Sequence, residues 1–224
     1  MKNFFIGVVV LMFVASGTVC AQSLSSQQKE QQALVNASKK ELNAKVSKAA
    51  RKEAKNLIKA GWKTAPGALP IDKQLDRSYT MQYQLDSNGD PLYIMSEGMS
   101  IGGNYDAAKM QALELAKQNL AGQIQTEVMA LVESTVGNKQ LGEDDAASIT
   151  KSVMAGKSLI SQSIGRVVPI VEAYQVVNGN NRNVLVRIAY SMDMAKSVAK
   201  KAIKEDLEKR GEELHGKLDE LLGW

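Results

Sequence analysis

The segment "YIMSEGMSIGGNYDAAKMQALELAKQNLAGQIQTEVMALVEST", residues 93–135, contains two different hydrophobic periods. Its first part, up to Ile101, reads as a strand, and Gly102-Gly103 ends it. Asn104 or Asp106 can cap a helix that starts immediately afterwards. Apolar residues then recur every three or four positions, which is the helical period: Leu113, Ala116, Leu120, Ile124, Val128 and Leu131. Interspersed alanines widen this face, so we expect the helix over 104–135 to lie close against a sheet.

A first β-hairpin is predicted immediately upstream of this segment. Tyr79, Met81, Tyr83 and Leu85 alternate with polar residues, as in a half-buried strand. Asn88-Gly89 follows, and both residues tolerate the positive φ of a tight hairpin turn. We therefore expect this strand to pair with a second one over 92–101.

A second hairpin is predicted downstream, over residues 166–177 and 183–190, around "NGNN". A shorter helix is expected over 144–156, with acidic residues at its N-terminus, where they favour the helix dipole. The sequence thus predicts an α+β domain over 78–192, with an antiparallel sheet of two β-hairpins and the helices packed on one face.

Long helices are predicted on both sides of this domain. Residues 22–62 form a basic helix with a narrow apolar stripe, with Trp62 packing its end onto the domain, and residues 63–77 form a connector. Residues 193–224 form a C-terminal helix with coiled-coil-like apolar steps. Gly211 lies on that seam, where it either breaks the helix or lets another backbone come close.

The terminal helices are the candidate contacts for self-association or for a protein partner. The residues that we single out for this role lie on the C-terminal seam or at its end: Leu207, Leu214, Leu218, Leu221 and Trp224. For Trp224 there are two interpretations, a plug that docks on a partner and a side chain that folds back onto its own chain.

The N-terminus has the layout of a secretory signal peptide over residues 1–21. Val19-Cys20-Ala21 followed by Gln22 fits the small-residue rule for cleavage after Ala21. The alternative is that Cys20, the one cysteine of the chain, becomes a lipid-bearing N-terminus, but Val19 fits poorly in the small-residue position that lipidation requires. After cleavage the chain would hold no thiol and no disulfide, and no later apolar run approaches the length of a bilayer span.

We find no pattern of residues that indicates catalysis. His215 is the one histidine of the chain, and it lies in a charged helical segment without cysteine or histidine partners for a metal. The acidic residues are scattered at turns and strand ends, with no spacing that selects a catalytic pair. We therefore expect no enzyme, no cofactor and no metal, and no nucleic acid as a partner.

The 93–135 segment, together with "SIGRVVPIVEAYQVVNGNNRNVLVRIAYS" over 163–191, resembles the lipoprotein-20 family of Gram-negative envelope proteins. That family is in turn similar to the N-terminal domain of a flagellar outer-membrane ring protein. The resemblance covers roughly residues 78–192. It implies a small α+β envelope domain that is used for association, without catalysis.

The expected function is therefore that of an exported, non-enzymatic cell-envelope protein that acts through binding or assembly. Its compartment would be the periplasm or cell surface of a Gram-negative bacterium, with peripheral outer-membrane contact as one option. The alternative is a module that binds a small molecule or a glycan. The residues that could line such a site are the tyrosines near the predicted strands: Tyr79, Tyr83, Tyr93 and Tyr174.

Overall fold

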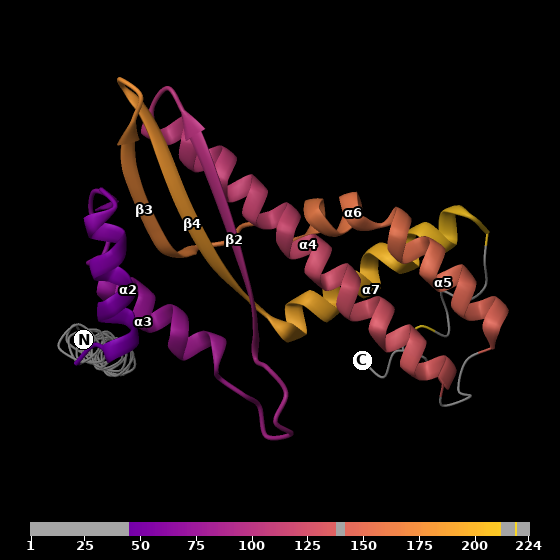
Figure 1. Ribbon diagram of the computed structural model, residues 1–224. Coiled ribbons are helices and arrows are strands. Elements are labelled where there is room, and N and C mark those ends of the chain that lie inside the picture. Colours follow the sequence, from indigo (N-terminus) through magenta and orange to yellow (C-terminus); the bar gives the residue numbers. More distant parts are fainter. Residues whose placement is uncertain (1–44, 138–141, 212–217, 219–224) are drawn as a thin grey trace, which may run out of the picture. The chain divides into compact units, whose positions relative to one another are not determined.

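The computed structural model of the chain describes residues 45–137, 142–211 and Leu218 (Figure 1). The described helices and strands lie in the unit that begins at Val46. In chain order they are α2 (Lys48–Lys59), β1 (Lys63–Thr64), α3 (Ile71–Gln82), β2 (Tyr93–Gly102), α4 (Tyr105–Gly137), α5 (Glu143–Ala155), α6 (Lys157–Ser163), β3 (Pro169–Val177), β4 (Asn181–Ser191) and α7 (Met192–Lys209). The predicted α+β class is confirmed.

The strands form one antiparallel sheet in the order β1-β3-β4-β2. The predicted second hairpin is confirmed as β3 and β4, whose turn contains Asn178 and Gly179, both at positive φ. β2 pairs with β4 from Tyr93↔Ser191 to Gly102↔Arg182 without any shift in register. β2 is therefore a long, regular strand at one edge of the sheet.

Helices cover both faces of the sheet, so the prediction of helices on one face only is wrong. The side chains of β4 explain why, since they alternate between two hydrophobic cores. Val184, Val186 and Ile188 pack with α4, whereas Leu185 packs with α2 and α3. In Figure 1, α2 and α3 lie beside β3. The helix α4 crosses β2 and β4 and extends beyond the sheet, where α5, α6 and α7 pack against it.

The predicted helix over 104–135 is confirmed as α4, and it lies very close to β2. Small residues on both elements allow this approach. Ala108, Ala112 and Ala116 of α4 are completely buried. They face Gly98 and Gly102 of β2, where a Cβ atom would collide with the α4 backbone. The predicted short helix is confirmed as α5, and α6, which was not predicted, follows it.

The predicted first hairpin is wrong. Residues 71–82 form α3, so the predicted 63–77 connector contains β1 and half of a helix, and the predicted domain boundary at 78 falls inside α3. The helical spacing of Ile71, Leu75 and Ser78, which are all buried, outweighs the short alternating run after it. Tyr83 is 73% exposed, as suits a residue after the helix end.

Asn88-Gly89 does form a turn, with Gly89 at positive φ, but this turn joins no pair of strands. One isolated bridge, between Leu85 and Pro91, closes the loop that carries it. The partner of β2 is instead β4, which is about ninety residues away in the sequence.

Within the range of the predicted N-terminal helix, the described residues contain one helix, α2, which begins at Lys48. The Ser47 hydroxyl caps it by accepting a hydrogen bond from the backbone N–H of Ala50 at 3.3 Å. A continuous helix through residues 45–47 is therefore wrong, and residues 22–44 lie outside the described residues. The helix ends in a Schellman motif, with Gly61 at positive φ. The next residue, Trp62, packs into the α2–α3 core as predicted.

The C-terminal helix is shorter than predicted, because α7 ends at Lys209. Gly211 follows the C-cap at φ +72°, a conformation that glycine adopts without steric cost. Of the two interpretations of Gly211, the structure supports the one in which it breaks the helix.

Candidate functional site

The predicted interaction residues of the C-terminal segment do not form a described surface. Leu207 and Leu218 are completely buried in the core shared by α4, α5 and α7, where a partner has no access to them. Leu214, Leu221 and Trp224 lie outside the described residues, as do Ala21 and Gln22 at the predicted cleavage site. His215 and Cys20 also lie outside them.

The four suspected tyrosines do not converge on one site. Tyr79 lies on α3 and donates a hydrogen bond to Glu53 of α2. Tyr174 lies on the other face of the sheet, edge-on to the ring of Tyr105 at a centroid distance of 5.6 Å. Tyr83 is exposed after α3, and Tyr93 begins β2. A single aromatic binding platform is therefore not formed.

A network of charged side chains joins α2 and α3 to the sheet. The Arg187 guanidinium donates to Glu97 from Nε at 3.0 Å and from Nη2 at 2.9 Å. It also donates to the Ser78 hydroxyl at 3.2 Å and lies 3.7 Å from a Glu53 oxygen. A catalytic pair of carboxyl groups needs one that is free to hold a proton. Here the Arg187 guanidinium pairs with both Glu97 and Glu53. The arrangement suits a structural ion-pair network.

A second polar cluster holds the start of α4 against β3. The Tyr105 hydroxyl donates to Glu172, and Lys109 lies 2.7 Å from the same carboxylate. Burial, followed by the hydrogen bond to Glu172, raises the pKa of Tyr105 above its usual value. The hydroxyl therefore stays protonated at neutral pH and acts as a hydrogen-bond donor. It is a poor base or nucleophile.

Within residues 45–137 and 142–211 there is no group of three or more histidine, cysteine, aspartate or glutamate side chains that could hold a metal ion. No helix in the same residues is both long enough and apolar enough to span a bilayer. Neither finding concerns the residues outside these ranges.

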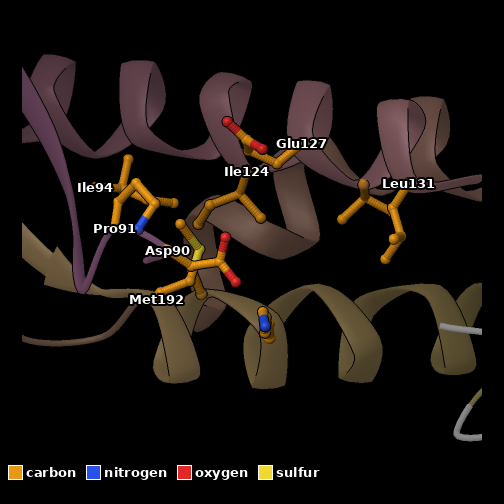
Figure 2. A pocket seen from close by; sticks show the side chains of 10 residues that line it. Asp90, Pro91, Ile94, Ile124, Glu127, Leu131 and Met192 are labelled. Carbon is orange, nitrogen blue, oxygen red and sulfur yellow. The ribbon is translucent and has the colours of Figure 1, made fainter. Parts of the chain in front are cut away.

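One hollow of about 310 Å³ lies between α4, the start of α7 and the loop before β2 (Figure 2). Its walls are mostly apolar, with Ile94, Ile124 and Met192 among the side chains that point into it. Asp90 and Glu127 place carboxylates at this hollow, and Lys196 adds one basic side chain. It could hold a small apolar group.

The free edge of β2 is the most distinctive surface of the described residues. The backbone N–H of Met192 donates to the carbonyl oxygen of Leu92 at 2.9 Å, in line with the β2–β4 register. Even-numbered residues of β2 therefore turn their backbone groups toward β4. Because these groups alternate along a strand, the odd-numbered residues point theirs outward: Tyr93, Met95, Glu97, Met99 and Ile101.

Few side chains of the described residues cover this edge. Asn119 of α4 donates to the carbonyl oxygen of Glu97 at 2.8 Å, which agrees with an outward-facing backbone at this odd-numbered residue. Met99 is 48% exposed and Ile101 is 56% exposed, on the face away from α4. Two hollows, of about 460 and 320 Å³, lie next to Glu97, one lined by α4 residues and the other reaching Tyr79 and Arg187. The edge therefore offers backbone groups, apolar side chains and space.

In the described residues, the opposite side of the sheet is closed along Glu172 to Tyr174, which makes the open β2 edge conspicuous. The two residues of β1 pair with Ala173 and Tyr174 of β3. Where β1 stops, the buried side chain of Gln74 takes its place, because its oxygen accepts the backbone N–H of Glu172 at 2.6 Å. Its amide nitrogen donates to the carbonyl of Leu69. An α3 side chain thus continues the hydrogen bonding of the strand.

Sequence reasoning missed the β2 edge because it paired this strand with residues 79–85. A signal was nevertheless present. The ten residues of β2 contain one charged residue, Glu97, and neither lysine nor proline, the residues that commonly protect an edge strand. That composition is informative only once β2 is known to lie at an edge.

Comparison with protein-family models, with curated proteins and with solved structures finds no match to this chain. What the fold and the site define is an α+β domain with an open antiparallel sheet, one edge of which pairs with no further strand among the described residues. The resemblance to the lipoprotein-20 family therefore remains a prediction from the sequence.

Proposed function

We propose that this chain is an exported, non-enzymatic protein of the bacterial cell envelope that acts by associating with another polypeptide chain. The observation that carries the proposal is the outward-facing backbone of β2, between Met95 and Ile101. An extended segment that pairs with such an edge gains main-chain hydrogen bonds, and neighbouring pockets select its side chains. The two hollows beside Glu97 would supply this selectivity.

The polar clusters support a binding role over catalysis. Arg187 pairs with Glu97 and Glu53, and Lys109 pairs with Glu172, so the most prominent carboxylates near the sheet have cationic partners. Export and the envelope location rest on the signal-like N-terminus and on the resemblance to the lipoprotein-20 family. Peripheral contact with the outer membrane belongs to the same proposal.

The contact surface differs from the terminal helices that the sequence suggested. A deletion of residues 203–224 would remove Ile203 and Leu207, both completely buried, so lost association could simply reflect unfolding. Single substitutions on the exposed side of β2 avoid this ambiguity, since they leave the core and the β2–β4 ladder in place.

The experiment is site-specific photo-crosslinking in cells of the native host. A photoreactive amino acid replaces Ile101 at the open edge or, as a matched control, Met154 on the exposed side of α5, which is 63% exposed. We expect a defined adduct with a polypeptide in the envelope fraction at position 101 and none at 154. No adduct at 101, or equal adducts at both positions, would contradict the proposal.

The second candidate function is the binding of a small molecule, and the hollow of Figure 2 is the observation that favours it. Ligand pockets are mostly apolar, with a few polar groups that fix orientation, and Asp90 and Glu127 would do so here. A cationic group on an apolar body fits this lining better than a glycan. Replacing Ala195 with leucine would fill the hollow, so such a ligand should stop raising the melting temperature of the variant.

A further inference from the structure

We infer that the β2 edge pairs with the β2 edge of a second copy of this chain, around a two-fold axis next to Gly98. This inference rests on the proposed function and names its partner. Antiparallel pairing of two identical edges makes one continuous sheet, and it presents the same surface on both subunits, as a two-fold interface requires.

The strand has the features needed for such pairing. It is ten residues long, and its ladder with β4 shows no bulge, whereas the β3–β4 ladder shifts register between Pro169 and Val171. Bulges, prolines and lysines are the usual features that prevent an edge strand from pairing with a further strand. β2 has none of these, and its one charge, Glu97, is paired with Arg187.

A two-fold axis next to Gly98 places apolar residues of the two copies opposite one another at Met95 and Ile101. In antiparallel register about this axis, Met95 of one copy lies opposite Ile101 of the other, and Met99 lies opposite Glu97. All four residues have outward-facing backbone groups, so the register allows main-chain hydrogen bonds between the copies. The Glu97 carbonyl accepts from Asn119 in the single chain, and it would exchange this partner for the N–H of Met99 in the second copy. Met99 and Ile101 are half-exposed in the single chain, and the pairing would cover them.

The residues of α4 along the same edge are complementary about the same axis. The Ser100 hydroxyl donates to Gln111 at 2.8 Å, and Asn119 donates to Glu97, so both amide side chains lie beside the edge. Leu115 lies between them in the helix, one turn from each, and is 40% exposed. The axis therefore brings Leu115 toward Leu115 of the second copy.

Gln111 of one copy then lies opposite Asn119 of the other. Amide side chains both donate and accept hydrogen bonds, so this pair is complementary in both directions. One axis thus matches Met95 with Ile101 on one face of the sheet and the amides on the other. This coincidence favours a second copy over an unrelated extended segment.

The first test measures self-association by sedimentation equilibrium. We expect the chain to be a dimer, and Ile101→Lys to raise the dissociation constant at least about tenfold, because symmetry places each substitution in the interface twice. Met154→Lys is the matched control and should leave the constant unchanged. Met99→Pro removes an outward N–H without touching the β4 ladder, and it should weaken the dimer as well.

The second test reads the register and uses chains in which Cys20 is replaced by serine. Chains with Gln111→Cys and chains with Asn119→Cys are mixed and treated with a short thiol-to-thiol crosslinker. We expect the mixed dimer to crosslink more strongly than either variant alone. Equal crosslinking in all three samples would overturn the proposed axis.

The outcomes separate this inference from the proposed function. A chain that stays monomeric at high micromolar concentration, or a dimer that Ile101→Lys does not weaken, would overturn pairing between copies. The proposed function would survive that result if position 101 still formed an adduct with a different polypeptide in cells. It would fail independently if position 101 formed no adduct at all.

Discussion

Gly98 of β2 lies so close to Ala112 of α4 that a Cβ atom on the glycine would be 2.0 Å from the Ala112 carbonyl oxygen. The same atom would lie 2.5 Å from the backbone nitrogen of Ala116. Real side chains do not approach a backbone this closely, and a buried helix backbone has no flexible end that could move away. The contact between α4 and the edge strand therefore depends on glycine at this position.

Gly98→Ala should lower the free energy of unfolding by about 3 kcal/mol or more, near the upper end of what overpacking usually costs. Chemical denaturation of the purified variant measures this. Gly103→Ala is the control, because no atom lies within 4 Å of its Cβ position and its φ is not positive. Its effect should stay within about 0.5 kcal/mol. Equal effects of the two substitutions would show that the helix does not approach the strand so closely.

Replacing Gln74 with leucine should destabilise the protein and open the closed edge of the sheet. The leucine has a similar size but leaves the N–H of Glu172 and the carbonyl of Leu69 without their partner. A buried polar group that loses its hydrogen bond costs about 1–3 kcal/mol, so the free energy of unfolding should fall by about 2–4 kcal/mol. Denaturation curves measure the loss.

The same Gln74 variant should also associate beyond the size of the wild-type protein, because β3 would then offer unpaired backbone groups. Size-exclusion chromatography with light scattering shows this. Gln82→Leu makes the same chemical change at an exposed position of α3 and should do neither. If the Gln74 variant matched that control, the bond to Glu172 would not close the edge.

Asp76 should stabilise the fold in a pH-dependent way through Ser47. Hydrogen bonds from the Ser47 hydroxyl and from its backbone N–H, which lies 2.9 Å away, lower the pKa of this carboxyl group below its ordinary value of 3.8. Because the pKa of Asp76 is lower in the folded than in the unfolded state, its contribution to the free energy of unfolding is complete at pH values above the unfolded-state pKa. This contribution is lost as the pH falls through the folded-state pKa.

The measurement compares the unfolding free energy of the wild type with that of Asp76→Asn across this range. The amide still accepts a hydrogen bond but carries no charge. The wild type should be more stable than the variant at about pH 6, and the difference should shrink as the pH falls through the folded-state pKa, which lies below 3.8. A difference that stayed constant with pH would exclude the carboxylate as its cause.

Leu207 should behave as a core residue. It is completely buried, so Leu207→Ala should lower the free energy of unfolding by about 2–5 kcal/mol. Thermal and chemical unfolding provide the measurement. Lys204→Ala, at an exposed position of the same helix, is the control and should change stability by less than about 0.5 kcal/mol. A stable Leu207 variant with weakened association would restore the sequence-based assignment of this residue as an interaction site.

The parts of the fold that sequence reasoning found are those with local signals. α4 has six apolar residues at helical spacing, and the β3–β4 hairpin has a turn sequence between alternating strands. α3 was missed because its buried face includes Gln74 and Ser78, which look like surface residues until their partners are known. The alternating run from Tyr79 then suggested a strand where the chain continues as a helix.

The candidate site was missed for a different reason. The pairing of Glu97 with Arg187 joins residues ninety positions apart, and no local pattern marks it. Without that pairing, β2 cannot be recognised as an edge strand, and its lack of lysine and proline has no meaning. Contacts of high sequence separation decide which strand lies at an edge, so the open edge emerges only from the tertiary structure.

Export is the remaining step of the proposed function, and it predicts a mass. Signal-peptide cleavage after Ala21 should yield a mature chain from the native host that starts at Gln22 and carries no acyl group, because Val19 is unsuited to the lipoprotein rule. Intact mass spectrometry measures this directly. A mass that corresponds to an acylated Cys20 would instead make the protein a membrane-anchored lipoprotein. Anchoring would confine both copies of the proposed dimer to one surface and raise their effective concentration, so the β2 edge could then pair with a much weaker intrinsic affinity.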